Sequence, residues 1–278
     1  MTILVLGGTR FFGVPMIEKL LAEGHDITVV TRGLTPDQFG DRIRRIRCDL
    51  FDYQQVERVL GGLSYDAVID KVTYSSNELR TVMDAVSCDT LIHMSTCSVY
   101  THDHFEIREE EFDPRVGKIV WNNRMEADYA TNKKRSEQVL FQYQGKASQR
   151  RRIAVRYPFV VGLHDYTDRL RFYARHLIEG EAMMVDDLDA EIGFIEEKEA
   201  GEFFSFLLNT DYEGPINGSA DGTMSIQGIL SYLTNKTKKT PIIKGNGDPA
   251  PYNGLQSHSY SLEKSKRLGY RFKEIRTW

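Results

Sequence analysis

The chain has 278 residues, of which 41% are hydrophobic and 27% are charged. This composition suits a folded chain with a full core and excludes the disordered, collagen-like and low-complexity classes. The 36 basic and 40 acidic residues nearly balance, so the overall charge gives no reason to expect a nucleic-acid or anionic-membrane partner.

Short β-branched runs alternate with amphipathic segments through residues 1–160. This alternation is typical of βαβ units, which build a parallel sheet covered by helices. The predicted strands and the helices between them are Ile3–Leu6, Val14–Glu23, Ile27–Val30, Arg44–Arg47, Gln54–Leu60, Ala67–Ile69, Thr90–Met94 and Ile153–Tyr157. The sequence therefore predicts an α/β fold with a doubly wound parallel sheet.

The regular alternation loosens after Pro158. Helical patterns remain at Leu170–Glu179, Glu199–Leu208 and Ser225–Leu233. We predict that residues 161–278 form a smaller α/β lobe that binds the substrate, with some of the chain returning to the first domain. The acidic segment 101–128 is interpreted as a solvated loop, with an active-site lid as the alternative.

The three cysteines stand at wide spacings, without the close pairs of disulfide frameworks or zinc sites. The first residues lack a signal-peptide pattern, and no stretch approaches the roughly 18 apolar residues of a membrane span. We therefore expect a cytoplasmic protein with no membrane association and no bound metal. His102 and His104 are interpreted as solvated loop residues.

A glycine-containing turn, Gly7-Gly8-Thr9-Arg10-Phe11-Phe12-Gly13, follows the first predicted strand and opens a helix. Glycines at such a turn let the backbone approach a pyrophosphate, whose charge the free N–H groups and the helix dipole stabilise. The turn predicts a dinucleotide site. Its expected contacts are Gly7, Thr9, Arg10, Phe11, Phe12 and Gly13.

The second strand leads into Thr31-Arg32, with no carboxylate at the position where many NAD proteins hold the adenosine ribose. A cation there can pair with the 2′-phosphate of NADP, and Arg10 could be a second such cation. We predict NADP, with NAD as the alternative. Asp49 and Leu50 follow the third strand and are expected beside the adenine.

Hydroxyl-bearing residues end the fifth strand at Ser95-Thr96, on the sheet edge where ligands bind in open α/β folds. Tyr129 and Lys133 are one helical turn apart and share a face of a predicted helix. A nearby ammonium group favours the phenolate and lowers the tyrosine pKa. We predict that Tyr129 is the acid/base group, that Lys133 lowers its pKa and that Thr96 holds the substrate oxygen.

Two further Tyr-x-x-x-Lys pairs occur late in the chain, at Tyr232–Lys236 and Tyr260–Lys264. Neither has a glycine turn or a serine-threonine strand end upstream in its lobe. We interpret both as surface coincidences.

Together these motifs resemble the extended short-chain dehydrogenase/reductase superfamily, in its NAD-dependent epimerase/dehydratase branch. Ser95–Tyr100 is similar to the S-[ST]-x-x-V-Y strand end of that family, and the segment from Tyr129 to Glu137 is similar to its Y-x-x-x-K-x-x-x-E helix. The resemblance implies a Rossmann fold and further cofactor contacts at Val72 and Tyr157.

The sequence departs from the family pattern at three places. Arg10 stands at the middle glycine of G-x-x-G-x-x-G, giving a GGTRFFG variant similar to that of chloroplast stem-loop RNA-binding proteins. The fourth strand ends in Asp70-Lys71-Val72-Thr73 instead of H-L-A-A. Ile192 replaces an arginine usual in nucleotide-sugar epimerases, which weakens the case for a nucleoside diphosphate substrate.

We therefore predict an NAD(P)-dependent oxidoreductase or epimerase/dehydratase acting on a sugar-like or other hydroxyl/carbonyl small molecule. The alternative is a non-catalytic RNA-binding or cofactor-sensing protein, suggested by the glycine-turn variant and by the basic clusters Arg42–Arg47 and Gln149–Arg152. The balanced charge and the absence of interleaved aromatics make nucleic acid the weaker prediction. The resemblance also implies a possible homodimer through the helices at Ser76–Val86 and Glu126–Tyr143.

Overall fold

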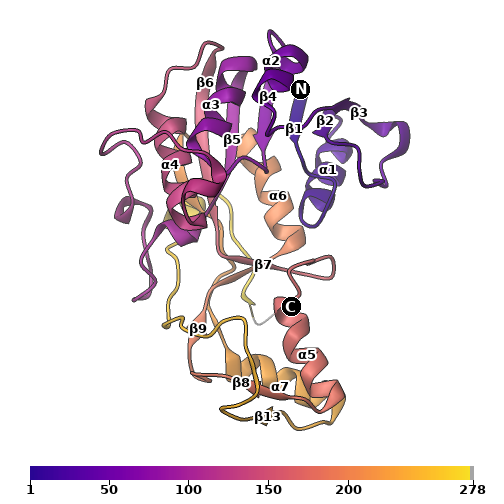
Figure 1. The fold of residues 1–278 in the computed structure, drawn as a ribbon, viewed down its shortest axis with the longest axis vertical. Helices are drawn as coiled ribbons and strands as arrows, with labels where there is room; N and C mark the ends of the chain where they lie inside the picture. The colour runs from indigo at the N-terminus through magenta and orange to yellow at the C-terminus, as the bar shows by residue number, and fades with distance from the viewer. Residues whose placement is uncertain (276–278) are drawn as a thin grey trace.

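A parallel sheet of seven strands forms the centre of the larger lobe in the computed structural model, which describes residues 1–275 (Figure 1). Its strand order is β11-β6-β5-β4-β1-β2-β3 and all neighbours are parallel. The strands are β1 (Thr2–Leu6), β2 (Asp26–Thr31), β3 (Arg44–Arg47), β4 (Ser64–Asp70), β5 (Ser87–Thr96), β6 (Gln149–Tyr157) and β11 (Gly214–Asn217). The doubly wound parallel sheet is confirmed.

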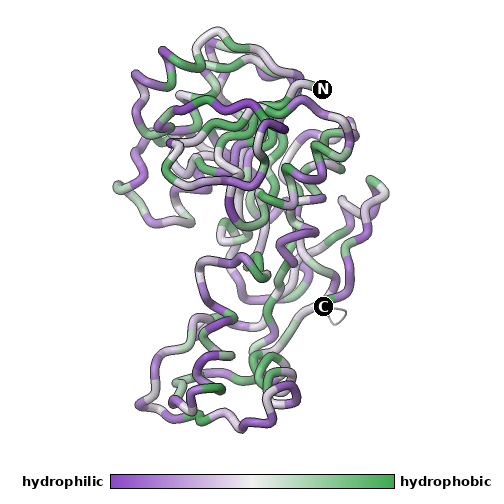
Figure 2. Tube along the Cα trace, turned by 90° about the vertical axis from the view of Figure 1, so that its right-hand side faces the viewer, coloured by the Kyte–Doolittle hydropathy of each residue, from purple (hydrophilic) through white to green (hydrophobic). Residues whose placement is uncertain are grey.

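Helices cover both faces of this sheet. They are α1 (Gly13–Ala22) and α6 (Glu197–Leu208) on one face, and α2 (Tyr53–Leu60), α3 (Ser76–Ala85) and α4 (Tyr129–Gln142) on the other. Because successive residues of a strand point to opposite faces, β1 contributes Ile3 and Val5 to the first core and Leu4 and Leu6 to the second. Figure 2 shows the hydrophobic stretches gathered in the interior of this lobe.

Helix α4 begins at Tyr129, three residues later than predicted. The carboxylate of Asp128 accepts a hydrogen bond from the backbone N–H of Thr131 at 2.9 Å and so caps the helix. Glu126 lies instead in a separate 3-10 turn, Arg124–Glu126. The cap places Tyr129 in the first turn of the helix, beside the carboxyl end of β5.

The smaller lobe holds two helices and several short strands around its own hydrophobic core. Its elements are β7 (Phe159–Val161), α5 (Arg169–Glu179), β8 (Ala182–Met184), β9 (Glu191–Ile192), β10 (Phe194–Glu196), β12 (Met224–Ser225), α7 (Ile226–Thr237), β13 (Ile242–Ile243) and β14 (Asp248–Pro249). Between β10 and β12 the chain returns to the larger lobe, where α6 packs against α1 and β11 pairs with β6. Helix α8 (Glu263–Arg267) contacts β11.

Buried residues anchor the acidic segment 101–128 to the rest of the protein. Its interpretation as a solvated loop is therefore wrong at Ile107 and Glu109. Ile107 is fully buried, and its N–H donates to the carbonyl of Ser259 at 2.9 Å. Glu109, only 3% exposed, lies in the 3-10 turn Glu109–Glu111 and accepts a hydrogen bond from the backbone N–H of Asn217 at 2.9 Å. The segment is thereby fastened to β11 and to the chain that precedes α8.

All three cysteines are free and buried. Within residues 1–275, no helix combines the length and the apolar character that crossing a membrane requires.

Candidate functional site

Two adjoining cavities open at the carboxyl edge of the sheet, where open α/β folds bind ligands. The first, about 320 Å³, lies over the glycine turn and the ends of β2 and β3. The second, about 380 Å³, lies between the end of β5, the start of α4 and the smaller lobe. Residues common to both cavities are Phe11, Phe12, Tyr74, Met94 and Tyr166.

The glycine turn is so tightly packed that it requires its glycines. Gly7 and Gly8 have φ of +79° and +95°, which L side chains rarely adopt. A Cβ on Gly7 would lie 2.4 Å from Cγ1 of Val72, and one on Gly13 would lie 2.3 Å from the carbonyl oxygen of Gly8. Gly7 lines the first cavity, whereas Gly13, predicted as a cofactor contact, does not and instead lets α1 pack against the turn.

Phe11, two residues before the helix, also has a positive φ of +54°. This conformation is strained for a bulky residue. Its ring packs edge-on against Phe12 and Tyr166, with centroids 5.2 and 5.9 Å away. These contacts hold the turn in the strained form and place Phe11 in the wall between the two cavities.

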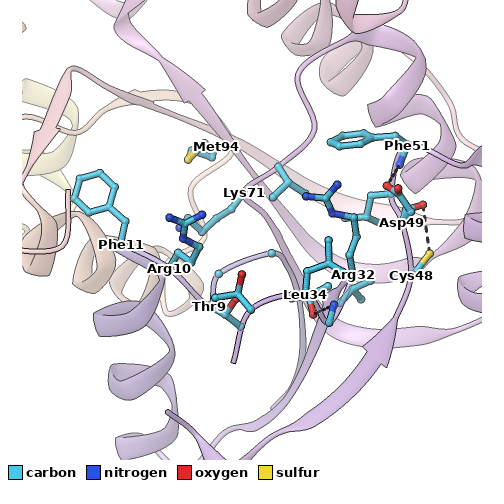
Figure 3. Close-up of a pocket in the computed structure, with 18 of the residues that line it drawn as sticks. Thr9, Arg10, Phe11, Arg32, Leu34, Cys48, Asp49, Phe51, Lys71 and Met94 are labelled. Carbon is cyan, nitrogen blue, oxygen red and sulfur yellow. Dashed lines mark hydrogen bonds between the residues drawn. The ribbon is translucent and has the colours of Figure 1, made fainter. Parts of the chain in front are cut away.

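Cationic side chains dominate the first cavity. Arg10, Arg32, Lys71 and Arg124 line it, and among the described lining residues the one carboxylate is that of Asp49. Figure 3 shows Arg10, Arg32, Lys71 and Asp49 around this cavity. Leu50, Val72 and Thr9 complete the predicted contacts found there. The arrangement fits a ligand with several negative charges.

Lys71 gives the clearest sign of an anionic ligand. It is only 9% exposed, and no ion pair to a carboxylate is formed by it within residues 1–275. Its ammonium group lies 3.7 Å from the ring centroid of Phe12, and burial lowers its pKa to about 7. A buried cation without a counter-charge is unfavourable unless a ligand supplies one, so the residues present fit a pyrophosphate.

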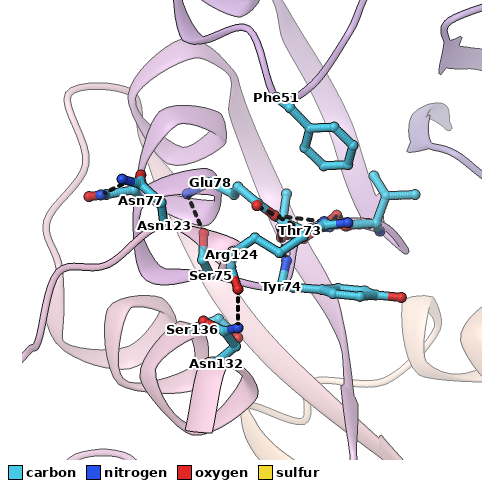
Figure 4. Close-up of polar contacts among 12 residues, drawn as sticks. Phe51, Thr73, Tyr74, Ser75, Asn77, Glu78, Asn123, Arg124, Asn132 and Ser136 are labelled. Carbon is cyan, nitrogen blue, oxygen red and sulfur yellow. Dashed lines mark hydrogen bonds and ion pairs between the residues drawn. The ribbon is translucent and has the colours of Figure 1, made fainter. Parts of the chain in front are cut away.

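Arg124 was not predicted from the sequence. Figure 4 shows its guanidinium between Phe51 and Tyr74, at 4.1 and 4.0 Å from their ring centroids. It also forms an ion pair with Glu78 at 2.8 Å. No motif marks this arginine, because the segment 101–128 reaches the cavity only through the tertiary fold.

Tyr129 and Thr96 meet in the second cavity, as predicted. The Thr96 hydroxyl forms a hydrogen bond that lowers the pKa of Tyr129, but desolvation outweighs it and raises that pKa to about 12. Tyr129 remains 44% exposed as a residue, so a ligand in the cavity can reach it. At neutral pH this phenol is protonated.

Lys133, predicted to lower the pKa of Tyr129, makes its own hydrogen bonds to the backbone. Its ammonium group is fully buried and donates to the carbonyl oxygens of Thr73 at 2.8 Å and Met94 at 2.6 Å. Desolvation lowers its own pKa to about 8. The ring of Tyr74 lies beside both groups, 4.7 Å from the ammonium and 5.4 Å, centroid to centroid, from Tyr129.

Tyr157 and Tyr260 both line the second cavity, and the interpretation of Tyr260 as a surface residue is wrong. Tyr157, expected beside the cofactor, lines the second cavity, and its hydroxyl donates to the carbonyl of Ala200 at 2.6 Å. Tyr260, interpreted as a surface residue, is 4% exposed and lines the same cavity. Tyr232 is 55% exposed, as expected of a surface residue.

His102 also departs from its interpretation as a solvated loop residue. It lines the second cavity, stacks on His258 with centroids 4.5 Å apart, and has its pKa lowered by burial. His104 is exposed and forms an ion pair with Asp103. Ile192, at the position of the missing arginine, is fully buried in the core of the smaller lobe.

The first part of the chain matches the sequence model of a known protein family. Residues 3–84 match the model of the NAD dependent epimerase/dehydratase family. The match begins in β1 and ends in α3, so it contains the whole glycine turn. The predicted resemblance is confirmed.

Solved structures extend the likeness to almost the entire chain. MoeE5 in complex with UDP-glucose and NAD superposes with a TM-score of 0.76 and 17% identity, covering 98% of this chain and 94% of that chain. A Thermus thermophilus UDP-glucose 4-epimerase in complex with NAD gives 0.70 and 20%, with the same coverage. A Bacillus cereus UDP-glucuronic acid 4-epimerase in complex with NAD gives 0.74 and 17%, covering 97% and 91%. At these identities the likeness establishes the fold.

A chloroplast stem-loop binding protein of Arabidopsis thaliana is 30% identical over 129 residues. The aligned region is 41% of this chain and spans 34% of that relative's length. It is the kind of relative that the GGTRFFG variant predicted.

Proposed function

We propose that this protein is an NAD(P)-dependent enzyme of the reductase or epimerase/dehydratase type, acting at a hydroxyl or carbonyl carbon of a small sugar-like molecule. One observation carries the proposal. The cation-lined cavity over the glycine turn adjoins, through shared walls of Phe11, Tyr74 and Met94, the cavity in which the hydroxyls of Tyr129 and Thr96 meet. A dinucleotide and a substrate could therefore bind side by side.

The first cavity offers a place for each part of the dinucleotide. The backbone of residues 7–12 would hold the pyrophosphate, with Arg10 and Lys71 supplying positive charge. Asp49 and Leu50 would lie near the adenine, and Val72 near a ribose. Arg32, which follows β2 and has no carboxylate partner within residues 1–275, favours NADP over NAD.

When bound, the nicotinamide would supply the hydride donor or acceptor. Tyr129 would transfer the accompanying proton to or from the substrate oxygen, which Thr96 would hold by a hydrogen bond. Since the pKa of Tyr129 is raised to about 12, the arrangement favours proton donation, as a carbonyl reduction requires. Lys133 would contribute by turning its ammonium group toward the nicotinamide ribose.

An RNA-binding role is the second candidate, favoured by the name of the Arabidopsis relative. Within the described residues, however, most arginines of the basic clusters make intramolecular contacts. Arg42, Arg44 and Arg45 pair with Glu18, Asp26 and Asp37. Arg152 donates to the carbonyl oxygens of Leu140 and Tyr143. The enzyme proposal therefore ranks first.

Two further expectations remain proposals. The buried free thiols suit a reducing compartment, so the cytoplasm is the proposed location. A homodimer through α3 and α4 is the proposed assembly.

Calorimetric titration with NADPH, NADH and their oxidised forms tests the proposal. Binding of a dinucleotide, followed by oxidation of the reduced form in the presence of carbonyl substrates, is the expected result. Failure of every dinucleotide to bind, combined with salt-sensitive RNA binding on filters, would instead favour the second candidate.

A further inference from the structure

The second cavity has a distinctive chemical lining. Several of its lining side chains carry hydroxyl groups, among them those of Thr96, Ser98, Thr167, Tyr129 and Tyr166. Among the described lining residues there is no carboxylate, and the one group charged at neutral pH is the guanidinium of Arg169. The remaining candidate, His102, has its pKa lowered by burial.

Arg169 has no carboxylate of its own to neutralise it. Its contacts within residues 1–275 are a hydrogen bond to the Thr167 hydroxyl at 3.4 Å and the ring of Phe159 at 5.3 Å. The two acidic residues nearest in sequence are engaged elsewhere. Asp165 accepts hydrogen bonds from the N–H and hydroxyl of Thr167, and Asp168 forms an ion pair with Arg171 at 3.1 Å.

The fold places this arginine in the cavity that also holds the acid/base group. Asp168 adopts a left-handed conformation with φ of +57°, which starts α5 so that Arg169 is its first residue. From there the charge of Arg169 acts on the Tyr129 phenol and lowers its pKa, against the larger effect of burial. Arg169 and Tyr129 both line the second cavity, so one ligand there can contact both.

We propose that Arg169 binds an oxyanion, a carboxylate or a phosphate, on a hydroxylated substrate, and so selects acidic sugars or polyols over neutral ones. The proposal rests on the proposed function, because it uses the same cavity and assigns Tyr129 to the reacting carbon. A guanidinium binds a carboxylate or phosphate through two parallel N–H donors, which fixes orientation as well as charge. The surrounding hydroxyls would bind the neutral part of the molecule.

The test uses protein saturated with its dinucleotide and three probes titrated by calorimetry: glucuronate, glucose 6-phosphate and glucose. We expect at least one acid to bind about tenfold or more tightly than glucose, and the stronger of the two identifies the anion. Arg169→Gln should weaken the binding of that acid by about 10- to 150-fold, as expected for the loss of a hydrogen bond to a charged group. Arg169→Lys should retain part of the affinity.

Arg175→Gln is the matched control, because this exposed arginine lies on the same helix but lines neither cavity. It should leave the affinities unchanged, and thermal unfolding verifies that all variants fold. Unchanged acid binding in Arg169→Gln, equal binding of glucose, or no binding of either acid would overturn the inference. Normal dinucleotide binding alongside any of these results would leave the proposed function standing, whereas loss of dinucleotide binding by the wild type would contradict the proposed function itself.

Discussion

Lys133 follows Tyr129 by one turn of α4, and its ammonium group donates hydrogen bonds to the carbonyl oxygens of Thr73 and Met94. The charge of Arg169, which lines the same cavity, lowers the pKa of Tyr129. Burial raises the pKa of Tyr129 by more than this charge and the Thr96 hydrogen bond lower it. In this arrangement the proton is available for donation to a substrate oxygen.

Replacing Tyr129 by Phe should abolish most turnover while leaving cofactor binding intact. The change removes only the hydroxyl that transfers the proton, and such groups contribute roughly 100- to 10,000-fold to rate. Turnover is measured as dinucleotide oxidation with the carbonyl substrate found by screening, and binding by calorimetry.

Tyr232→Phe is the control for that experiment, since Tyr232 begins another Tyr-x-x-x-Lys pair but is 55% exposed and lines neither of the two cavities. Its activity should match the wild type. A Tyr129→Phe enzyme that keeps full turnover would remove Tyr129 from the proposed mechanism.

Lys71→Met should weaken dinucleotide binding and flatten its pH dependence. Burial lowers the pKa of Lys71 to about 7, whereas a bound pyrophosphate favours the charged form. Above pH 7 the wild type must therefore take up as much as about one proton on binding, and its affinity should fall as pH rises. Calorimetry in buffers of different ionisation enthalpy measures this uptake, with Lys19→Met on the exposed side of α1 as control.

The same residue should affect the pH dependence of stability. Its folded pKa lies below the unfolded value of about 10.4, so the unfolded chain binds more protons between pH 7 and that value. The Lys71 contribution to the free energy of unfolding therefore rises with pH through this window. The free energy of unfolding of Lys71→Met, measured by urea denaturation, should exceed that of the wild type by more at pH 7 than at pH 10. A difference that stays the same at both pH values would contradict the lowered pKa of Lys71.

Arg32→Ala should discriminate between the two cofactors. Loss of a charge-assisted contact to the 2′-phosphate is expected to weaken NADPH binding by about 10- to 150-fold and to change NADH binding little. Arg58→Ala, an exposed arginine on α2 outside the two cavities, is the control. Equal loss for both dinucleotides would mean that Arg32 contacts a shared part of the cofactor.

Glu137→Ala should destabilise the fold by about 3–5 kcal/mol, because it leaves the fully buried guanidinium of Arg156 without its counter-charge. Glu137→Gln keeps hydrogen-bond acceptors for Arg156 and should cost less. Asp89→Ala breaks the exposed pair with Arg150 and should change stability by no more than about 1 kcal/mol. Urea denaturation ranks the three variants, and similar values for Glu137→Ala and Asp89→Ala would contradict the prediction.

The alternation of strands and helices was readable from local patterns. Each strand of the large sheet except β11 was predicted, because β-branched runs such as Ile27–Val30 reflect burial on both faces. Strand β11 was not predicted, since it is short and begins with Gly214 and Pro215, which are rare in strands; it pairs with β6 at the edge of the sheet. Strands β5 and β6 are longer than predicted. Their additional residues are mostly polar, so the pattern of hydrophobic residues does not show that they belong to the strands.

The sequence alone determined the glycine turn, the strands of the sheet, and the positions of Thr96 at a strand end and of Tyr129 and Lys133 one helical turn apart, because glycine spacing, strand ends and helical registry are local properties. Only the tertiary structure decided the electrostatics. Lys71 became a buried cation, Lys133 was directed to backbone carbonyls, and Arg124 and Arg169 entered the cavities from distant segments. A side chain's pKa and contacts depend on desolvation and on charges that the folded chain brings together, which no local pattern encodes.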